Sequence, residues 1–403
     1  MIKEFDVIVL GGGPAGSVAA MFLAKAGKRV CLIEKANFPR DKICGDAQGR
    51  KAAGIMRKLG IYEEYEKLPG QKIYGITLSS PNGTQIEVDV EDRKNPAPGY
   101  VHKRIVFDEF LFKNAVKLVT ELKNVVAKDV IVEDGCVKGL VIDNNGHKEE
   151  VRSKILIAAD GATSIVAAKF KLNDNPTDHF ISAIRGYYKN VSGMTDRIEI
   201  HMVDELIPGY FWIFPLPNNE ANVGLGMIIT DMAEKKINLK DAMIRAIEKN
   251  PLFKDRFKNS ELVGDIKGWN LPLASHRRKI YGNGFILLGD AAGLIDPLSG
   301  EGVGTAMISG EVGANVAIDA LNKEDVSEKY LKRYDKELWE IIGDEIDADY
   351  KVQRLGKKFP HLIDKLMVKA SKDEKFRKEF EKMLPYTGGR KKLGTKEFIK
   401  LLL

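Results

Sequence analysis

The residues best suited to chemistry begin at the turn Gly-Gly-Gly-Pro-Ala-Gly of residues 11–16. Gly11, Gly13 and Gly16 have the spacing that lets a backbone turn approach a pyrophosphate closely and pack a helix tightly against a strand. Glu34 follows Gly11 by 23 residues, close to the spacing at which a carboxylate reaches the ribose hydroxyls. A carboxylate there disfavours a 2′-phosphate. The pattern therefore predicts a dinucleotide site other than one for NADP.

A second glycine-rich segment, residues 289–306, lies almost three hundred residues after this turn. Asp290 follows a predicted strand, and Pro297 predicts a turn before Gly302 and Val303 open a predicted helix. Free N–H groups at a helix start favour an anion. Asp160 ends a third predicted strand; singly, either aspartate suits a plain helix cap. Three such loops favour a single cofactor that is bound by segments from both ends of the chain. Such binding is more typical of a permanently bound flavin than of an exchangeable nicotinamide.

An aromatic segment, YFWIFP, begins at Tyr210. In a strand, Tyr210, Trp212 and Phe214 share one face, because successive side chains alternate. Ring faces stabilise a nearby cation by about 0.5–2 kcal/mol each, so this face suits a reaction that develops positive charge. The other interpretation is an aromatic strand of the core.

Hydrophobic patterning supplies the elements that must position these residues. An apolar run at 5–10, a helical pattern at 15–26 and a second apolar run at 29–33 form a βαβ unit. We predict further helices at 49–59, 104–122 and 239–248, hairpins at 73–79 with 84–90 and at 125–132 with 137–144, and a strand at 153–159. Alternating strands fill 174–268, and the chain is charged and helical from Val326 onward.

These elements predict an α/β fold: a discontinuous Rossmann-like FAD-binding domain, an inserted antiparallel-sheet substrate domain and a C-terminal helical region. The expected cofactor domain covers 1–72, 98–173 and 275–325, the sheet-rich substrate domain covers 73–97 and 174–274, and the helical region covers 326–403.

The composition narrows the class of protein. With 403 residues, 44% hydrophobic and 30% charged, the chain suits a globular enzyme, and a diffuse net charge of +6 argues against nucleic acid. Cys31, Cys44 and Cys136 show no metal or disulfide spacing, so we expect a reducing, cytoplasmic setting. We expect no signal peptide, since Met1–Glu4 leads straight into a predicted strand, and we expect no membrane span, since no apolar run reaches 18 residues. The basic tail at 389–403 suits an anionic membrane surface or a solvated helix.

The order of the three loops resembles the p-hydroxybenzoate-hydroxylase-like flavoproteins, which carry GxGxxG, DG and GD motifs in this order. The resemblance implies FAD as the cofactor, with Arg104 near its phosphates and Asp290 on its ribityl or ribose chain. Ala167 stands where that family has an arginine, so that position receives no role. The cofactor-binding residues that we expect are Gly11, Gly13, Ala15, Gly16, Glu34, Cys44, Gly45, Ala47, Arg104, Ala127, Asp160, Asp290, Pro297, Gly302 and Val303.

Two more segments resemble geranylgeranyl reductases, the archaeal members above all. FPRDKICGDA at 38–47 is similar to their cysteine loop, and the segment 210–226 is similar to their YxWxFP motif followed by GxG. Leu216 replaces a lysine often found there. The resemblance implies an enzyme that saturates geranylgeranyl chains, with Tyr210, Trp212 and Phe214 around the substrate. Cys44 is then the expected catalytic proton donor or a residue that packs on the flavin.

We therefore expect an FAD-dependent geranylgeranyl reductase that acts on an archaeal glycerophospholipid at the membrane periphery. Its expected partners are a prenylated lipid, the membrane surface and an external electron donor, either reduced ferredoxin or NAD(P)H. A flavin monooxygenase acting on an aromatic or quinone, and an electron-transfer flavoprotein, remain alternatives. The histidines suggest no metal site, and the basic run 276–279 suits either a phosphate head group or a solvated loop.

Overall fold

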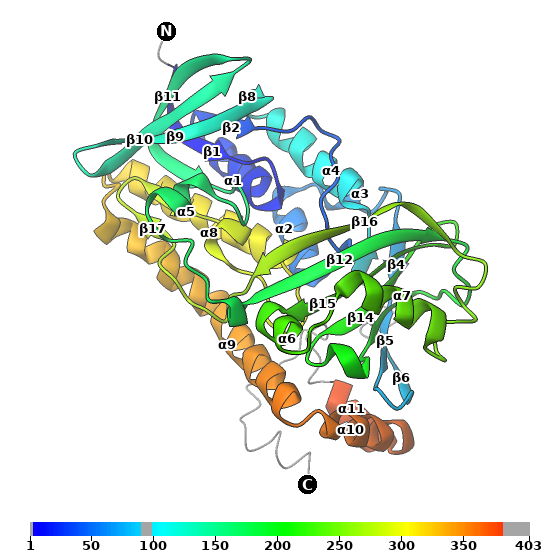
Figure 1. Ribbon diagram of the computed structural model, residues 1–403. Helices are drawn as coiled ribbons and strands as arrows, with labels where there is room; N and C mark the ends of the chain where they lie inside the picture. Colours follow the sequence, from blue (N-terminus) through cyan, green and yellow to red (C-terminus); the bar gives the residue numbers. More distant parts are fainter. Residues whose placement is uncertain (1–2, 90–98, 382–403) are drawn as a thin grey trace.

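The computed structural model describes residues 3–89 and 99–381, which form two large sheets with helices around them (Figure 1). Predictions that fall on 90–98, including the end of the strand predicted at 84–90, lie outside the described residues. The predicted contact of the basic tail 389–403 also lies outside them.

The first sheet carries the glycine turn and follows the order β17-β18-β11-β1-β2-β8, with β9 and β10 continuing from β11. β1, β2, β8, β11 and β18 run parallel, and β17 pairs antiparallel at the edge. Val7, Ile8 and Val9 of β1 are fully buried, as expected of a parallel strand covered on both faces. The strands are β1 (Lys3–Leu10), β2 (Val30–Glu34), β8 (Thr120–Lys123), β9 (Val125–Glu133), β10 (Cys136–Asn144), β11 (His147–Ala158), β17 (Tyr281–Gly282) and β18 (Phe285–Leu287).

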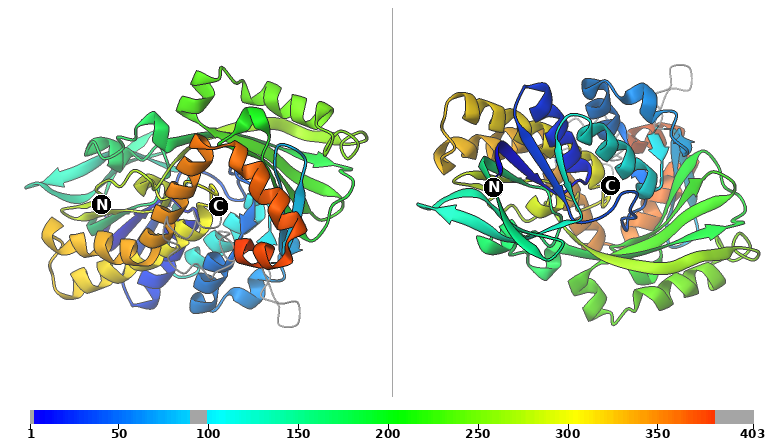
Figure 2. Two further views of the ribbon diagram at one scale, coloured as in Figure 1. Left: turned by 90° about the horizontal axis from the view of Figure 1, so that it is seen from below. Right: turned by 90° about the horizontal axis from the view of Figure 1, so that it is seen from above.

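Helices from distant parts of the chain pack together beside this sheet (Figure 2). α1 contacts both α4 and α8, and α2 and α9 contact α8 in turn. Helix α9 runs from the parallel sheet toward the second sheet and leads to α10 and α11. The helices are α1 (Pro14–Lys25), α2 (Arg50–Leu59), α3 (Tyr62–Tyr65), α4 (Arg104–Val116), α5 (Ile165–Lys169), α8 (Val303–Asn322), α9 (Glu328–Lys358), α10 (His361–Lys372) and α11 (Glu374–Glu381).

The second sheet has seven strands in the order β16-β12-β15-β14-β13-β5-β6. Its pairs are antiparallel except that β13 runs parallel to β5. Side chains on one face, such as Phe211 and Ile213, pack against α7, whereas Trp212 and Phe214 belong to the core on the opposite face. The elements are β5 (Gly75–Ser79), β6 (Gln85–Asp89), β12 (Phe180–Lys189), β13 (Arg197–His201), β14 (Tyr210–Leu216), β15 (Glu220–Ile228), β16 (Glu261–Pro272), α6 (Ile229–Glu234) and α7 (Leu239–Lys249).

A small sheet of β3 (Ala47–Gln48), β7 (Gly99–Val101) and β4 (Gln71–Ile73) joins the two large ones. Met367 and Ala370 of α10 and Phe376 of α11 pack into the core under the second sheet. A parallel Rossmann-like sheet, an antiparallel second sheet and C-terminal helices confirm the predicted fold class. The exact domain bounds remain a prediction.

One predicted element is wrong. We predicted a helix over 104–122, but α4 ends at Val116, and Thr120–Lys123 form β8. There Thr120 to Lys123 pair in register with Cys31 to Glu34 of β2. Val119 and Thr120 are β-branched and form helices poorly, and the open edge of β2 offers their backbone hydrogen-bond partners instead.

Candidate active site

A cavity of about 720 Å³ opens between the carboxyl ends of the parallel strands and the inner face of the second sheet. The residues that follow β1, β2, β11 and β18 line one side of it, and β12 to β16 line the other. The site residues predicted from sequence that line this cavity are Gly11, Gly13, Ala15, Glu34, Cys44, Gly45, Ala47, Arg104, Ala127, Asp160, Tyr210, Trp212, Phe214, Asp290, Pro297, Gly302 and Val303.

Gly16 is the one predicted site residue that does not line the cavity. A Cβ on Gly16 would lie 1.8 Å from the carbonyl oxygen of Gly11, so this glycine allows α1 to approach the turn. Gly11 has φ +103°, a conformation that favours glycine. Gly13 is different, because a Cβ there would meet only the guanidinium of Arg40, at 3.6 Å. Gly16 and Gly11 therefore build the turn, and Gly13 leaves room in front of it.

The N-terminus of α1 faces this room. Its N-cap, Gly13, supplies no side-chain cap. The first N–H groups of a helix lack partners within the helix, and together with the helix dipole they favour an anion. The turn is therefore suited to a phosphate group.

Glu34 ends β2 beside the same turn. Its Oε2 accepts a hydrogen bond from the Gly12 amide at 2.7 Å, and its Oε1 accepts one from the Ala36 amide at 2.8 Å. These bonds fix the carboxylate, and each oxygen keeps a further lone pair for a hydroxyl group. The geometry is suited to the ribose role predicted for Glu34.

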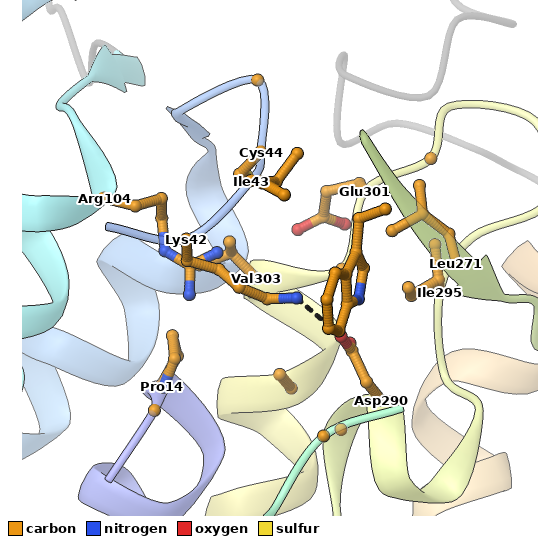
Figure 3. A pocket seen from close by; sticks show the side chains of 18 of the residues that line it. Pro14, Lys42, Ile43, Cys44, Arg104, Leu271, Asp290, Ile295, Glu301 and Val303 are labelled. Atoms are coloured by element: carbon orange, nitrogen blue, oxygen red, sulfur yellow. Dashed lines mark ion pairs between the residues drawn. The ribbon is translucent and has the colours of Figure 1, made fainter. Parts of the chain in front are cut away.

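Asp290 projects into the cavity opposite the cysteine loop, with Lys42 beside it (Figure 3). The Lys42 Nζ lies 3.8 Å from Asp290 Oδ2 and 4.3 Å from the centroid of the Trp269 ring. Burial lowers the pKa of Lys42, although the charge of Asp290 opposes this shift. Lys42 thus places a cation in contact with both sides of the cavity.

Asp160 provides an acceptor with no partner of its own. Its Oδ2 accepts a hydrogen bond from the Ile165 amide at 2.9 Å, and its buried Oδ1 has no hydrogen-bond partner. Burial raises the pKa of this carboxyl. An unsatisfied buried acceptor in a cavity wall is costly unless a ligand supplies a donor.

The start of α8 forms another part of the wall. Its N-cap, Gly302, has no side-chain cap, but Glu301 Oε1 accepts a hydrogen bond from the Gly304 amide at 2.8 Å. Lys51 lies 3.1 Å from both Glu301 and Glu345 of α9. Burial alone would lower the pKa of Lys51, but these two carboxylates raise it. These ion pairs connect α2, the start of α8 and α9 at this end of the cavity.

Arg104 lies at the start of α4 and is nearly fully buried. Its guanidinium makes two hydrogen bonds to Asp108, at 2.5 and 2.7 Å, and Arg40 also contacts Asp108 at 2.7 Å. Burial would lower the pKa of Arg104, but Asp108 and then the nearby Cys44 raise it. Arg104 is therefore a fixed cation beside the cysteine loop.

Cys44 lines the cavity and is partly buried (Figure 3). Its sulfur accepts a hydrogen bond from the Asp46 amide at 3.4 Å. An N–H directed at the sulfur stabilises the negative charge left behind when a thiol gives up its proton. This geometry is compatible with proton donation and with simple packing.

The aromatic residues of β14 line the cavity on a single face, as their alternation predicted. Tyr210 donates a hydrogen bond to the carbonyl of Ser299, and Trp212 Nε1 donates one to Asn222 Oδ1 at 2.9 Å. Trp212 and Phe214 are only 8% and 7% exposed, so their rings meet the cavity and not solvent. The aromatic strand thus joins the segment of Pro297–Gly302 to the second sheet.

Sequence reasoning missed several residues that build this site. Lys42 and Asp46 lie inside the cysteine loop, so the sequence alone shows that they are close to Cys44. It does not show which residues of other elements they contact. Gln353 of α9 donates a hydrogen bond to the carbonyl of Pro297, and no sequence pattern links the two.

The basic run 276–279 mostly serves the fold. Arg277 pairs with Asp347 at 2.8 Å and lies 4.3 Å from the centroid of the Trp339 ring. Arg278 donates hydrogen bonds to the carbonyls of Ala291 and Ala292, both at 3.2 Å. Neither residue lines the cavity.

Within residues 3–89 and 99–381, no group of three or more His, Cys, Asp or Glu side chains is placed to hold a metal ion. Across the same described ranges, no helix combines the length and apolarity that a bilayer crossing requires.

The chain matches a sequence family described as an FAD binding domain over residues 4–344. It is 34% identical to digeranylgeranylglycerophospholipid reductase 1 of Methanopyrus kandleri, over 84% of this chain and 86% of that protein. It is also 34% identical to the digeranylgeranylglycerophospholipid reductase of Methanosarcina acetivorans, over 85% of this chain and 82% of that protein.

Solved structures also resemble this chain. A geranylgeranyl bacteriochlorophyll reductase-like protein from Thermoplasma acidophilum superimposes with a TM-score of 0.83 and 26% identity, covering 100% of this chain and 96% of that one. A flavin-dependent brominase superimposes with a TM-score of 0.78 and 23% identity, covering 99% and 97% of the two chains, which shows a shared fold only.

Proposed function

Because this chain belongs to the geranylgeranyl reductase family of FAD-dependent oxidoreductases, we propose that it saturates carbon–carbon double bonds of geranylgeranyl chains. We further propose that these chains belong to a membrane glycerophospholipid of the digeranylgeranylglycerol phosphate type. The relatives named above support this substrate class, since their names specify digeranylgeranylglycerophospholipid.

The residues present fit FAD. Gly13 leaves space before the uncapped start of α1, Glu34 keeps lone pairs free, and Asp160 Oδ1 has no partner. We propose that the glycine turn and Arg104 hold the phosphates and that Glu34 holds the adenosine ribose. Asp160, Asp290, Pro297, Gly302, Val303, Gly45, Ala47 and Ala127 would hold the rest of the cofactor.

The observation that carries the proposal is the apolar half of the cavity. Its lining residues cross the inner face of the second sheet from β16 through β12, β15, β14 and β13 to β5. Six adjacent strands are about 24 Å wide at ~4.8 Å per spacing. The 16-carbon backbone of an extended geranylgeranyl chain is about 19 Å long, because each of its bonds of ~1.5 Å advances the zigzag chain by about 1.25 Å. The face is thus wide enough for such a chain.

The side chains along this face suit a hydrocarbon. Ile76, Ile198 and Ile181 are aliphatic, and Leu271 and Trp269 extend the surface on β16. Each buried CH₂ group contributes about 0.8 kcal/mol when it leaves water. A long prenyl chain therefore gains more from this face than a single aromatic ring does.

Reduced FAD, when bound, would supply a hydride, which carries the electron pair and one of the two hydrogen atoms that saturate the double bond. An isolated alkene is not electrophilic, so the protein must also supply a proton and stabilise developing positive charge. We propose that Cys44 donates this proton at its Sγ. The rings of Tyr210, Trp212 and Phe214 then face the carbon that becomes electron-poor, and the apolar face excludes water from it.

We propose that the electrons come from an external donor, reduced ferredoxin or NAD(P)H, and that the protein works in the cytoplasm at the membrane surface. A lipid substrate supports the membrane contact, because its head group remains at the bilayer while a prenyl chain enters the cavity. Vesicle flotation with and without the prenylated lipid tests this contact.

The reaction itself is tested by incubating the FAD-loaded protein anaerobically with digeranylgeranylglycerol phosphate and dithionite. Mass spectrometry should then detect lipids heavier by successive pairs of hydrogen atoms. Protein without FAD serves as the control. An unchanged lipid in the presence of fully reduced enzyme would refute the proposal.

The same assay in air separates the alternatives. Oxygen uptake that depends on an aromatic or quinone substrate and yields a hydroxylated product would identify a monooxygenase. Electron passage to a protein acceptor with no organic product would identify an electron-transfer flavoprotein.

A further inference from the structure

Asp46 lies two residues after Cys44 and is completely buried, yet it does not line the cavity. Its φ of +67° is left-handed, a conformation that aspartate and asparagine tolerate better than most residues. A buried carboxyl in an unusual backbone conformation needs a physical reason, because desolvation disfavours its charge.

The carboxylate is held by donors from three other elements. Tyr187 of β12 donates to Oδ2 at 2.7 Å, and Asn222 of β15 donates to the same oxygen at 2.8 Å. The amide of Arg104, the first residue of α4, donates to Oδ1 at 3.1 Å. One side chain thus connects the cofactor side of the molecule with two strands of the second sheet.

The contacts continue directly to the two groups that face the substrate space. The Asp46 amide donates to Cys44 Sγ, and Asn222 also donates to the carbonyl oxygen of Cys44 at 2.7 Å. The other end of the Asn222 amide accepts the hydrogen bond from Trp212 Nε1. A chain of hydrogen bonds therefore runs from Cys44 through Asp46 and Asn222 to Trp212.

We propose that Asp46 is a positioning residue that holds Cys44 and Trp212 in fixed places on two sides of the cavity. This inference rests on the proposed function only where turnover is measured. Asp46 does not line the cavity, and its one side-chain contact with a residue proposed to bind FAD is to the backbone amide of Arg104, not to the guanidinium.

The charge on Asp46 is what the network requires. Ionised, the carboxylate accepts all three donors. Protonated, it places its own O–H against the Tyr187 and Asn222 donors at Oδ2 or against the Arg104 amide at Oδ1, and loses an acceptor. The groups that face Asp46 are Tyr187 and Arg185 from β12, Asn222 from β15, Arg104 from α4 and Cys44 from its own loop. In addition, the backbone N–H of the buried His102 donates a hydrogen bond to the Asp46 carbonyl at 3.1 Å. Burial raises the pKa of Asp46 to about 6.

The test compares Asp46→Asn with the parent protein in a Cys136→Ser background, both loaded with FAD. Asparagine keeps the size of the side chain, but it turns one acceptor oxygen into a donor that opposes either the Tyr187 and Asn222 donors or the Arg104 amide. The loop around Cys44 should loosen, so iodoacetamide should alkylate Cys44 at least about tenfold faster. The FAD dissociation constant should stay within about threefold of the parent value.

Asp231→Asn is the matched control. Asp231 is also buried, but it pairs with Lys357 at 2.5 Å and does not line the cavity. Its replacement should leave alkylation of Cys44 unchanged. Tyr187→Phe is the milder second variant, in case Asp46→Asn does not fold, and should accelerate alkylation about threefold.

Turnover distinguishes a positioning role of Asp46 from a purely structural one, because loss of a purely structural residue would not change kcat selectively or remove a limb of the pH profile. Asp46→Asn should lower kcat about tenfold with little change in KM. Parent activity should fall as the pH drops through about 6, and the variant should lack this acid limb. Alkylation rates within twofold of the parent in both folded variants would overturn the inference, whether or not the protein reduces a prenyl chain.

Discussion

The two halves of the cavity are lined by different kinds of chemical group. On the cofactor side, glycine turns and helix starts after parallel strands present backbone N–H groups, as at Gly11–Gly16 and Gly302–Val303. On the substrate side, the inner face of an antiparallel sheet presents side chains such as Trp212 and Phe214. Backbone groups recognise a fixed anion and depend little on side-chain identity. Side chains shape an apolar space and can be exchanged singly.

This difference predicts that substitutions in one half should leave the other half working. Mutations at the glycine turn should remove FAD, and mutations on β14 should change turnover while FAD stays bound. Asp46 contacts both halves, since α4 and the second sheet both donate hydrogen bonds to it, but we expect its replacement to affect Cys44 and to spare FAD binding.

The largest effect is expected from Gly13→Glu. The side chain has room, because the nearest atom is the Arg40 guanidinium at 3.6 Å, but its carboxylate would stand where we propose that the cofactor phosphate binds. Repulsion of several kcal/mol should weaken FAD binding about 100-fold or more, measured by flavin fluorescence. Gly54→Glu on α2, where a Cβ meets nothing within 4 Å, is the control. Normal flavin content in Gly13→Glu would show that the glycine turn does not hold the cofactor phosphates.

Next in size is Cys44→Ala. If Cys44 donates the proton, kcat should fall about 100-fold or more, because positioned proton transfer contributes ~10²–10⁴-fold. FAD should remain bound, as its visible spectrum would show. Cys136→Ala tests for unspecific effects of losing a thiol. A loss of less than about threefold would assign Cys44 to packing alone.

A pH-dependent stability difference is expected for Asp46→Asn. Burial raises the pKa of Asp46 to about 6 from 3.8, so the folded protein binds this proton more tightly than the unfolded chain. The wild type should therefore gain up to about 3 kcal/mol over the variant as the pH falls from about 7 to about 4, and lose it as the pH rises through about 6.

Urea unfolding of both proteins across this range measures the difference and cancels the shared contribution of His102, whose pKa burial lowers to about 4. The gain comes from removing a buried charge, whereas the hydrogen bonds to that charge are what position Cys44. A difference that is constant with pH would contradict the buried, titrating carboxyl.

A smaller effect is expected from Trp212→Phe. The ring face remains, but the hydrogen bond from Nε1 to Asn222 is lost, which costs about 1 kcal/mol. The value of kcat/KM for the prenyl lipid should fall about fivefold, with unchanged FAD affinity. Trp339→Phe on α9 is the control. Loss of FAD from Trp212→Phe would show that the two halves are coupled through β14.

The smallest effect is expected from Arg277→Ala. This arginine pairs with Asp347 on the surface and stacks on Trp339, so its loss should cost less than about 1 kcal/mol of stability. The KM for a phosphorylated prenyl lipid should not change. A tenfold rise in KM would instead assign the basic run 276–279 to the lipid head group.

The contrast also explains what could be predicted from sequence. Gly11 and Asp290 follow strands and Glu34 ends one, so local pattern sufficed to predict that these residues lie around one site, and all three line the cavity. The faces of β14 followed from alternation alone. In contrast, Thr120–Lys123 form a strand because β2 leaves an open edge, a tertiary fact that local helical patterning conceals.

The partners of Asp46 show the same limit. Tyr187 and Asn222 are 141 and 176 residues away in sequence, and only the packing of two sheets brings them to the cysteine loop. Gln353 and Glu345 reach the cavity from a helix with no motif of its own. Side-chain sites assembled from distant strands leave no local signal.

An anaerobic single turnover shows whether the reduced flavin of this protein saturates a prenyl double bond. The FAD-loaded protein is reduced, freed of excess reductant and mixed with digeranylgeranylglycerol phosphate while the visible absorption of the flavin is followed. We predict that the flavin reoxidises without oxygen and that about one double bond is saturated per FAD, detected as a lipid heavier by two hydrogen atoms. A flavin that stays reduced with the lipid and reoxidises only when air is admitted would refute the proposal that this protein reduces geranylgeranyl chains.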